Sequence, residues 1–304
     1  MSELCFPAAS LPPVHAGWYL VSFANEIGRG LTPLSIGHRD LLALRDRDVI
    51  RVFDARCPHR GAHLGHGGRF AKGAVICPFH GKRIGLGGPG RLAVAEHQVL
   101  RAGDAVFVRL SGDPGYDRGF RQVISDLAEE RCFIGFLTEH VPVPPEIIVE
   151  NAFDVEHFSA VHLVPHVTGM EIKPGETGEL VIEGQFGSAP PFWDGTQDGV
   201  VYNRFHDRAY SPSIVVGEFG PSDRSHIVIT TAIPAPGGCI VRFVLAIRPG
   251  QMGEYGDLAA GARHAFRQDF KVWSHLDLTV TPRLDAADAA VVAFRRFCAE
   301  FPAA

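Results

Sequence analysis

The sequence lacks the long apolar runs and the excess of basic residues that mark several classes of protein. Apolar stretches such as 105–108 and 239–247 are short, and Arg242 interrupts the second, so neither approaches the length of a membrane-spanning helix. The 29 lysines and arginines are outnumbered by 34 acidic residues, which gives a net charge of -5. Such a chain has no general attraction for nucleic acid or anionic lipid. We therefore expect no nucleic-acid partner and no membrane span.

Cysteine and lysine are also sparse. Six cysteines scattered over 304 residues are too few for a disulfide framework, and they indicate a reducing compartment. The first residues contain an acid, Glu3, where a secretory signal has a basic region, and no apolar core follows. Arginine far exceeds lysine, as is typical of a GC-rich bacterial genome. Together these features predict a cytoplasmic bacterial protein.

What the chain does contain suits a packed globular protein, since 46% of its residues are hydrophobic and 21% are charged. From Gly17 to about Leu110, short β-branched or aromatic runs end at turn residues, which predicts a small all-β domain. A hairpin turn is expected at 45–48, and the glycines between 85 and 90 predict an irregular loop. The expected strands are 18–23, 41–45, 49–53, 74–77 and 105–109.

Residues 111–115 are rich in turn formers and mark the expected domain boundary. We expect an N-terminal segment over 1–14, a first domain over 15–115 and a second domain over 116–304. In the second domain Pro145 opens a helical stretch, and helices are expected over 255–275 and 286–300. The expected strands are 179–186, 199–206, 213–219, 225–233 and 239–247, with the last two joined by a hairpin at 234–238. Strands flanked by helices predict an α+β chain.

Two mixed pairs of cysteine and histidine form the strongest motif. Cys57-Pro-His59 and Cys77-Pro-Phe-His80 are separated by 17 residues, and each lies on a short turn. Thiolate suits iron and sulfide, and two imidazoles on one iron give the ligand set of a Rieske [2Fe-2S] centre. Structural zinc is the competing interpretation, but zinc modules usually pair Cys with Cys and His with His. The nearby histidines 63 and 66 are not expected to be ligands, because four ligands complete the cluster.

A second motif lies in the helical stretch after Pro145. Asp154 and His157 are three residues apart and share a helix face, whereas His162 is five residues beyond His157 and would diverge from it. The helix must therefore loosen or end between the two histidines if both are to bind one metal. Taken alone, the pair is also consistent with an amphipathic helix whose histidines border the core.

Asp269 decides between these interpretations. On a helix it shares a face with Phe266 and Trp273, so its carboxyl group is expected to point into apolar surroundings. A carboxylate is costly there unless it is paired or bound to a metal. Two histidines and one carboxylate with open positions form the facial triad of non-haem Fe(II) oxygenases.

With these motifs, the chain resembles the terminal oxygenase (alpha) component of a Rieske non-haem iron oxygenase over nearly its whole length. Asn151, Asp154, His157 and His162 match the family signature Asn-x-x-Asp-x-x-His-x-x-x-x-His, and Asp269 fits the late acidic element. The resemblance implies a helix-grip catalytic domain, in which a curved antiparallel sheet holds a long helix. It also implies catalytic roles for Asp154 and Asn151, a cluster held by Cys57, His59, Cys77 and His80, and Fe(II) held by His157, His162 and Asp269.

In that family a ferredoxin or an NAD(P)H-dependent reductase supplies electrons, and the subunits form head-to-tail homotrimers. The resemblance implies that the cluster of one subunit serves the iron of its neighbour, with Asp154 between them. It also implies that O2 is used to hydroxylate, desaturate or demethylate an organic substrate. Alternatives from other classes are an electron-transfer protein and a ligand-binding protein without oxygenase activity.

Three local features refine this expectation. Ala62 and Phe79 occupy the positions where respiratory Rieske proteins have an extra cysteine pair, so the oxygenase type is favoured, although Lys82 replaces the tryptophan that is common in the family. The stretch from Asp269 to 297 resembles oxygenases that hydroxylate or desaturate steroids, which suggests a bulky apolar ring substrate. Candidate aromatic pocket residues are Phe192, Trp193, Phe205 and Tyr210, although aromatics in strands more often belong to the core.

Overall fold

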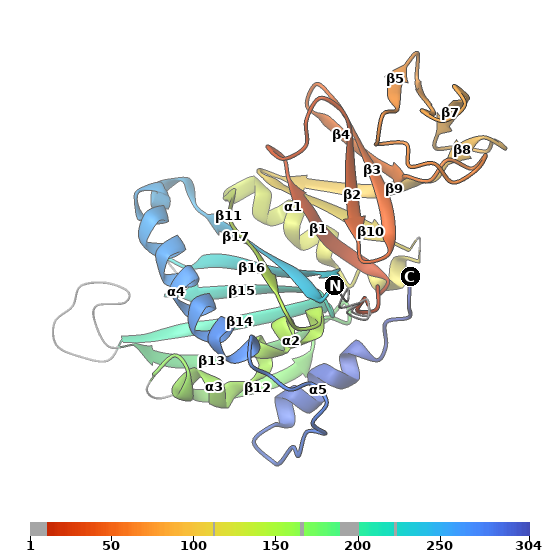
Figure 1. Cartoon of the computed structure of the whole chain (residues 1–304). Coiled ribbons are helices and arrows are strands. Elements are labelled where there is room, and N and C mark those ends of the chain that lie inside the picture. Colours follow the sequence, from red (N-terminus) through yellow and green to blue (C-terminus); the bar gives the residue numbers. More distant parts are fainter. Residues whose placement is uncertain (1–10, 112, 165–166, 189–200, 222–223) are drawn as a thin grey trace, which may run out of the picture.

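The structure, a computed structural model, describes residues 11–111, 113–164, 167–188, 201–221 and 224–304. Two antiparallel sheets dominate the chain, and a small third sheet projects from one end (Figure 1). The first sheet has the strand order β1-β10-β9-β4-β3-β2. Its strands are β1 (Gly17–Phe23), β2 (Gly30–Ile36), β3 (Arg39–Asp46), β4 (Val49–Asp54), β9 (Glu96–Ala102) and β10 (Ala105–Leu110).

The small sheet lies within residues 55–95, between β4 and β9, and we call these residues the distal lobe. Its strand order is β5-β6-β7-β8. A core that includes Leu64, Val75 and Ile84 supports the lobe from inside. The strands are β5 (Arg69–Ala71), β6 (Ala74–Ile76), β7 (Arg83–Leu86) and β8 (Ala93–Val94).

The second large sheet has the order β11-β17-β16-β15-β14-β13-β12 and is antiparallel throughout. Its strands are β11 (Cys132–Val141), β12 (Val167–Pro174), β13 (Leu180–Ser188), β14 (Val201–Ser211), β15 (Ile214–Gly220), β16 (His226–Ala235) and β17 (Gly238–Ile247). The α-helices are α1 (Phe120–Glu130), α2 (Pro145–Glu150), α3 (Val155–Ala160), α4 (Tyr255–Trp273) and α5 (Ala289–Cys298), and the 3-10 helices are η1 (Pro114–Tyr116), η2 (Asn151–Phe153) and η3 (Pro249–Glu254).

Both faces of the second sheet are covered. On one face, Phe120 of α1 packs with Trp18 of β1 and Tyr210 of β14 in a core that joins the two large sheets. On the other face, Phe266 and Trp273 of α4 pack against β16 and β17. A curved antiparallel sheet thus holds the long helix α4, as Figure 1 shows, and the predicted helix-grip arrangement and α+β class are confirmed.

Strand β1 illustrates how burial on both faces shapes the sequence. All seven of its residues are buried. Trp18 and Leu20 belong to the core between the sheets, whereas Tyr19 and Val21 belong to the core of the first sheet. A strand buried on both faces needs no polar alternation, which explains why its residues are apolar except for Ser22.

Most of the expected elements are present. The hairpin at 45–48 joins β3 to β4, and the hairpin after Pro234 joins β16 to β17. The helical stretch after Pro145 is divided into α2, η2 and α3, and the expected strand 199–206 extends further as β14. The irregular loop at 85–90 begins only after β7 ends at Leu86. Among the described residues, no helix is both long and apolar enough to cross a membrane.

Candidate metal centres and their cavity

The two cysteine motifs form matching turns in the distal lobe. The Cys57 carbonyl oxygen accepts a hydrogen bond from Gly61 N at 2.8 Å, and the Cys77 carbonyl oxygen accepts one from Gly81 N at 3.0 Å. Both glycines have positive φ angles, 75° and 66°, which favour glycine at these positions. The repeated Cys-Pro-x-x-Gly pattern therefore presents two similar loops to one site.

The donor atoms of these loops divide between the interior and the surface. Cys57 and Cys77 are 3% and 2% exposed, whereas His59 and His80 are exposed. The two imidazole rings lie 4.8 Å apart, centroid to centroid. Burial opposes ionisation of Cys77, but backbone N–H groups of Phe79 and His80 bring the pKa of the thiol below its ordinary value. Two buried thiols beside two surface imidazoles fit a [2Fe-2S] cluster whose histidine-bound iron lies nearest the solvent.

The surface of the distal lobe is strongly basic. Residues 55–95 contain no aspartate or glutamate, although the whole chain carries a net charge of -5. Six of the basic side chains are exposed and Lys82 is half-buried. The seven basic residues are Arg56, Arg60, Arg69, Lys72, Lys82, Arg83 and Arg91.

The second site begins where α3 starts. The Asp154 side chain caps this helix by accepting a hydrogen bond from His157 N at 3.4 Å. The helix ends at Ala160, with Val161 as its C-cap, so His162 lies outside it. The predicted interruption between the two histidines is therefore present, and it allows their rings to approach to 4.9 Å between centroids.

Hydrogen bonds orient the imidazole of His157. Its Nδ1 lies against the Asp154 carbonyl oxygen, which assigns the ring proton to Nδ1. Its Nε2 lies 3.0 Å from Nδ2 of Asn151, so Nε2 is the unprotonated nitrogen and accepts a hydrogen bond from this amide. Burial lowers the pKa of His157 to about 4, which keeps the ring neutral as metal binding requires.

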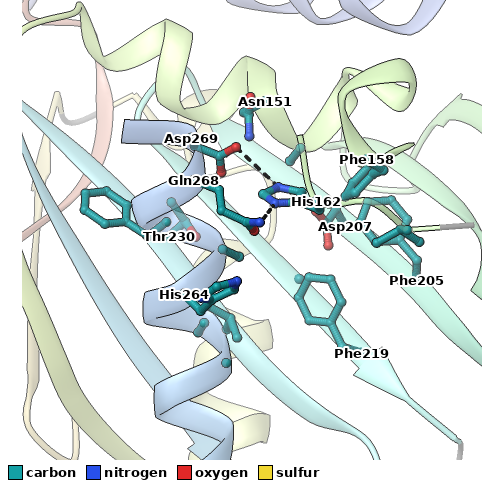
Figure 2. Close-up of a pocket in the computed structure, with 18 of the residues that line it drawn as sticks. Asn151, Phe158, His162, Phe205, Asp207, Phe219, Thr230, His264, Gln268 and Asp269 are labelled. Atoms are coloured by element: carbon teal, nitrogen blue, oxygen red, sulfur yellow. Dashed lines mark hydrogen bonds and ion pairs between the residues drawn. The ribbon is translucent and has the colours of Figure 1, made fainter. Parts of the chain in front are cut away.

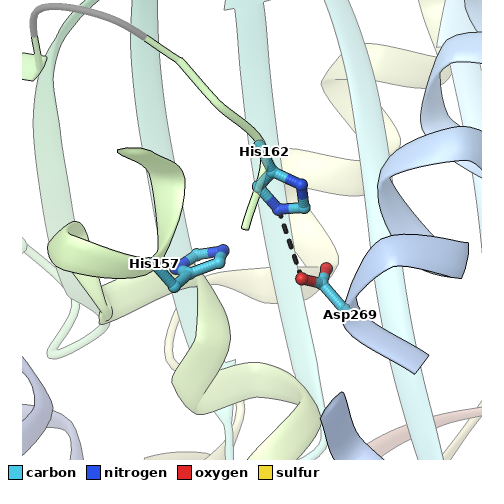
Figure 3. Close-up of side chains that lie close together, drawn as sticks. All are labelled: His157, His162 and Asp269. Carbon is cyan, nitrogen blue, oxygen red and sulfur yellow. Dashed lines mark ion pairs between the residues drawn. The ribbon is translucent and has the colours of Figure 1, made fainter. Parts of the chain in front are cut away.

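A second set of contacts orients His162. Its Nδ1 lies 3.0 Å from Oε1 of Gln268, and its Nε2 lies 3.3 Å from a carboxylate oxygen of Asp269 (Figure 3). Gln268 and Asp269 are neighbours on α4, so this helix both orients one imidazole and supplies the carboxylate. Burial also lowers the pKa of His162.

His157, His162 and Asp269 converge on one point. One possible ligand atom from each lies within 4.8 Å of the others, and this is the one such group of three or more among the described residues. Burial raises the pKa of Asp269 to about 7, an effect that the Asn151 amide partly offsets. A bound cation would favour the ionised carboxylate in this apolar place, so the residues present fit a mononuclear iron.

These three side chains lie on the wall of a cavity of about 570 Å³ between α4 and the second large sheet. Figure 2 shows Asp269, Gln268 and His264 projecting from α4, with Phe205 and Phe219 facing them from the sheet. The lining is mainly apolar, and the described residues that line it include no lysine or arginine.

The other histidines and aromatic residues considered as candidates lie in different parts of the fold. His63 and His66 pack together beside a separate small hollow, and Nδ1 of His63 accepts a hydrogen bond from Gly65 N at 3.1 Å. Phe205 lines the cavity, whereas Tyr210 belongs to the core between the sheets. Residues 192 and 193, the other two pocket candidates, lie outside the described residues.

Sequence reasoning missed other polar residues of the cavity. Gln268 had a detectable signal, since it precedes Asp269 on the same helix. Asp207, His226, Thr230 and His264 also line the cavity, and only the folded sheet and helix bring them there.

Comparisons with known proteins agree with this geometry. Residues 17–107 match the Rieske [2Fe-2S] domain, and residues 122–301 match the 3-ketosteroid 9alpha-hydroxylase C-terminal domain. The 3-ketosteroid-9-alpha-monooxygenase oxygenase component of Rhodococcus rhodochrous is 22% identical over 97% of this chain and 82% of its own length. The structure of dicamba monooxygenase bound to 3,6-dichlorosalicylic acid superposes with a TM-score of 0.72 at 20% identity, covering 95% of this chain and 97% of that one.

Cholesterol 7-desaturase nvd of Drosophila melanogaster is 25% identical over 52% of this chain, and the match spans 40% of the fly protein. The C-terminal match alone covers more than half of the present chain. The chain therefore belongs to the Rieske oxygenases, with a C-terminal domain of the 3-ketosteroid 9alpha-hydroxylase family, and its cofactors are a [2Fe-2S] cluster and a mononuclear iron.

Proposed function

We propose that this chain is the terminal component of an oxygenase that uses O2 to hydroxylate, desaturate or demethylate an apolar organic ring compound. The observation that carries the proposal is the convergence of His157, His162 and Asp269 on the wall of an apolar cavity. A carrier of electrons alone, or a ligand-binding protein, has no need of three metal-ligating atoms at that position.

The proposed roles follow from the contacts of each side chain. Cys57, His59, Cys77 and His80 would hold the cluster, and His157, His162 and Asp269 would hold the iron. When bound, the cluster stores single electrons and the iron supplies the chemistry of O2. The chain itself keeps both iron-site imidazoles neutral, with Nδ1 of His157 and of His162 donating to Asp154 and Gln268.

The cavity determines what can reach the iron site. Its aromatic and aliphatic lining excludes water and favours a ligand that buries apolar rings. The match to a steroid hydroxylase domain and the similarity to a cholesterol desaturase support a steroid-like substrate.

Electron transfer between the two sites is proposed to occur across subunits of a homotrimer. Figure 1 shows the distal lobe at the opposite end of the molecule from α3 and α4, which carry His157 and Asp269. His59 and His80 are exposed, so a neighbouring subunit can contact them directly. In this arrangement Asp154, assisted by Asn151, would connect a cluster histidine of one subunit with His157 of the next.

A ferredoxin or a reductase is the proposed electron donor, and we propose that its acidic surface contacts the basic distal lobe. We also propose the division of the chain into a cluster domain over 15–115 and a catalytic domain over 116–304. The described cysteines are all free of disulfide bonds, which supports a role in the reducing cytoplasm of a bacterium.

Iron content tests the proposed function. We expect about three iron atoms per chain, two in the cluster and one in the cavity, together with the visible spectrum of a Rieske centre. His162→Ala is expected to lower the content to about two and to abolish product formation from a panel of ring compounds, while leaving the cluster spectrum intact.

The matched control is His66→Ala, which removes another histidine that we do not assign to either metal. It is expected to retain about three iron atoms. Two iron atoms per chain in the unmodified protein would instead identify an electron carrier, whereas three iron atoms in His162→Ala would show that His162 does not hold the cavity iron.

A further inference from the structure

Asp207 is a buried acidic side chain of the cavity wall that belongs to neither metal centre. It lies on β14, is 3% exposed, and faces the cavity between Phe205 and Phe219 (Figure 2). Its Oδ1 atom is buried and has no hydrogen-bond partner among the described residues. A carboxyl oxygen left unpaired in an apolar wall is destabilising, so its presence calls for a role outside the folding of the chain.

The neighbouring strand is shaped to leave room for this carboxyl group. Asp207 is paired with Gly217 of β15, and a Cβ atom at that glycine would lie 2.4 Å from Oδ1 of Asp207. Any larger residue at position 217 would therefore force the carboxyl group to move. Val215 and Phe219, two residues to either side of Gly217, also line the cavity and enclose the group with apolar surface.

The charge of the cavity restricts what Asp207 can bind. Arg208 is the charged residue that acts on it, and as the next residue of a strand it points to the opposite face of the sheet. Burial raises the pKa of Asp207 well above its ordinary value, which favours the neutral acid. A neutral acid can donate a hydrogen bond to a carbonyl oxygen and accept one from a hydroxyl group.

Charged ligands fit the cavity less well than neutral ones. An organic anion would meet a carboxyl group and no lysine or arginine among the described lining residues. An ammonium group would require Asp207 to ionise within an apolar wall, which is costly.

We propose that Asp207 is a specificity-determining residue that hydrogen-bonds the carbonyl or hydroxyl oxygen of a neutral, otherwise apolar ring compound. The inference deepens the proposed function and rests on it, because it takes the cavity to be the substrate site. It selects ketones and alcohols over organic acids and amines of the same ring skeleton.

Direct binding tests this inference without turnover. The probes are four androstane steroids that carry a ketone, an amine, a carboxylic acid or no polar group on the same ring carbon. Their dissociation constants are measured by equilibrium dialysis against the purified metal-loaded protein, without an electron donor. The ketone is expected to bind at least about tenfold more tightly than the hydrocarbon. The hydrocarbon has no oxygen to accept a hydrogen bond, so its binding leaves the buried Asp207 carboxyl group without a partner.

Variants at position 207 distinguish the effect of the hydrogen bond on ligand binding from the effect of side-chain shape. Asp207→Leu is expected to weaken ketone binding by about tenfold and to leave hydrocarbon binding nearly unchanged. Asp207→Asn keeps an N–H donor and is expected to retain ketone binding within about threefold. His206→Asn is the matched control, because this residue precedes Asp207 on β14 and does not line the cavity, and it is expected to change none of the four constants.

Three results would overturn the inference. If ketone and hydrocarbon bind equally to the original protein and to Asp207→Leu, the carboxyl group does not select the ligand, although the proposed function stands. If the amine binds most tightly and Asp207→Asn loses it, the site is one for cations. If no androstane binds while the iron content is as expected, the steroid-like substrate and this inference both fail, although the proposed metal centres stand. Should Asp207→Leu not fold, Asp207→Asn still decides between ketone and amine.

Discussion

The orientation of His162 depends on the Gln268 amide as well as on Asp269. Gln268 is the partner of its Nδ1 and lies 106 residues away in sequence, so this contact exists only in the folded chain. Partners of this kind fix the tautomer of a metal-binding imidazole, and their loss commonly reduces metal affinity by about 10–100-fold.

We therefore expect Gln268→Leu to release iron from the cavity site at a chelator concentration that leaves the original protein loaded. Gln268→Glu keeps an acceptor for the Nδ1 proton and is expected to restore retention. The exposed neighbour on α4, Arg267→Gln, is the control. Equal iron retention in all three variants would show that packing alone orients His162.

Asp207 also affects how stability changes with pH. Because its pKa is raised in the folded chain, the folded state keeps a proton that the unfolded state has released between the two pKa values. The free energy of unfolding therefore falls as pH rises through this window.

Asp207→Asn removes this loss, so its gain in Tm over the original protein is expected to increase from pH 5 to pH 8, measured at equal metal content. A constant difference in Tm would mean that Asp207 is ionised throughout. The other titratable groups facing the cavity are the same in both proteins, and their effects largely cancel; they are His157, His162, His226, His264 and Asp269.

At the scale of the element, α3 is a short helix that depends on its first residue. Asp154 is its N-cap, and asparagine caps a helix about as well as aspartate does. Asp154→Ala is expected to destabilise the chain by about 1 kcal/mol, whereas Asp154→Asn is expected to have little effect on stability.

The asparagine variant also tests the proposed electron route. Asp154→Asn is expected to retain both metals while the cluster of the reduced protein is oxidised very slowly by O2 and substrate in a single turnover. Metal content and cluster absorbance are followed together. Rapid oxidation with a normal yield of product would make Asp154 a helix cap and nothing more.

A helix or strand can be predicted from the sequence when the pattern that indicates it lies in neighbouring residues. The apolar face of α4 was predicted from Phe266 and Trp273, because helical spacing is a local property. Helix α1 carries the same kind of signal in Phe120, Val123, Ile124 and Leu127, but it was not assigned.

Two strands that are not predicted from the sequence contain residues that are unfavourable in strands. Strand β2 contains Pro33, and β11 contains Gly135. A Cβ atom at Gly135 would lie 2.4 Å from the ring of Phe23, so this glycine is required by a contact between the two large sheets. No local pattern in the sequence reveals such a requirement.

At the scale of the whole molecule, the motifs gave the two groups of candidate ligands, but not their surroundings. Cysteine and histidine spacing indicates a cluster, and the interrupted helix indicates a metal site. The cavity, by contrast, is lined by residues of α2, η2, α3, α4 and five strands, and its polar residues Asp207 and Gln268 come together only through the tertiary fold.

The distal lobe contains basic residues and no acidic ones. The molecule therefore has a positive end although its net charge is negative. Such a molecule is pre-oriented by an acidic partner during diffusion, so the lobe should govern the rate of encounter more than the strength of the final complex. Added salt screens this attraction, with a screening length of about 10 Å at 0.1 M ionic strength.

The second-order rate constant for reduction of the cluster by an acidic ferredoxin is therefore expected to fall severalfold as ionic strength rises. The single-turnover rate of the protein reduced beforehand should not change. Arg60→Gln, beside His59, is expected to weaken the salt dependence, whereas Arg283→Gln, an exposed arginine outside the lobe, is not. A rate of reduction that is independent of salt would mean that the donor docks elsewhere, and that the positive end of the molecule meets only the neighbouring subunit.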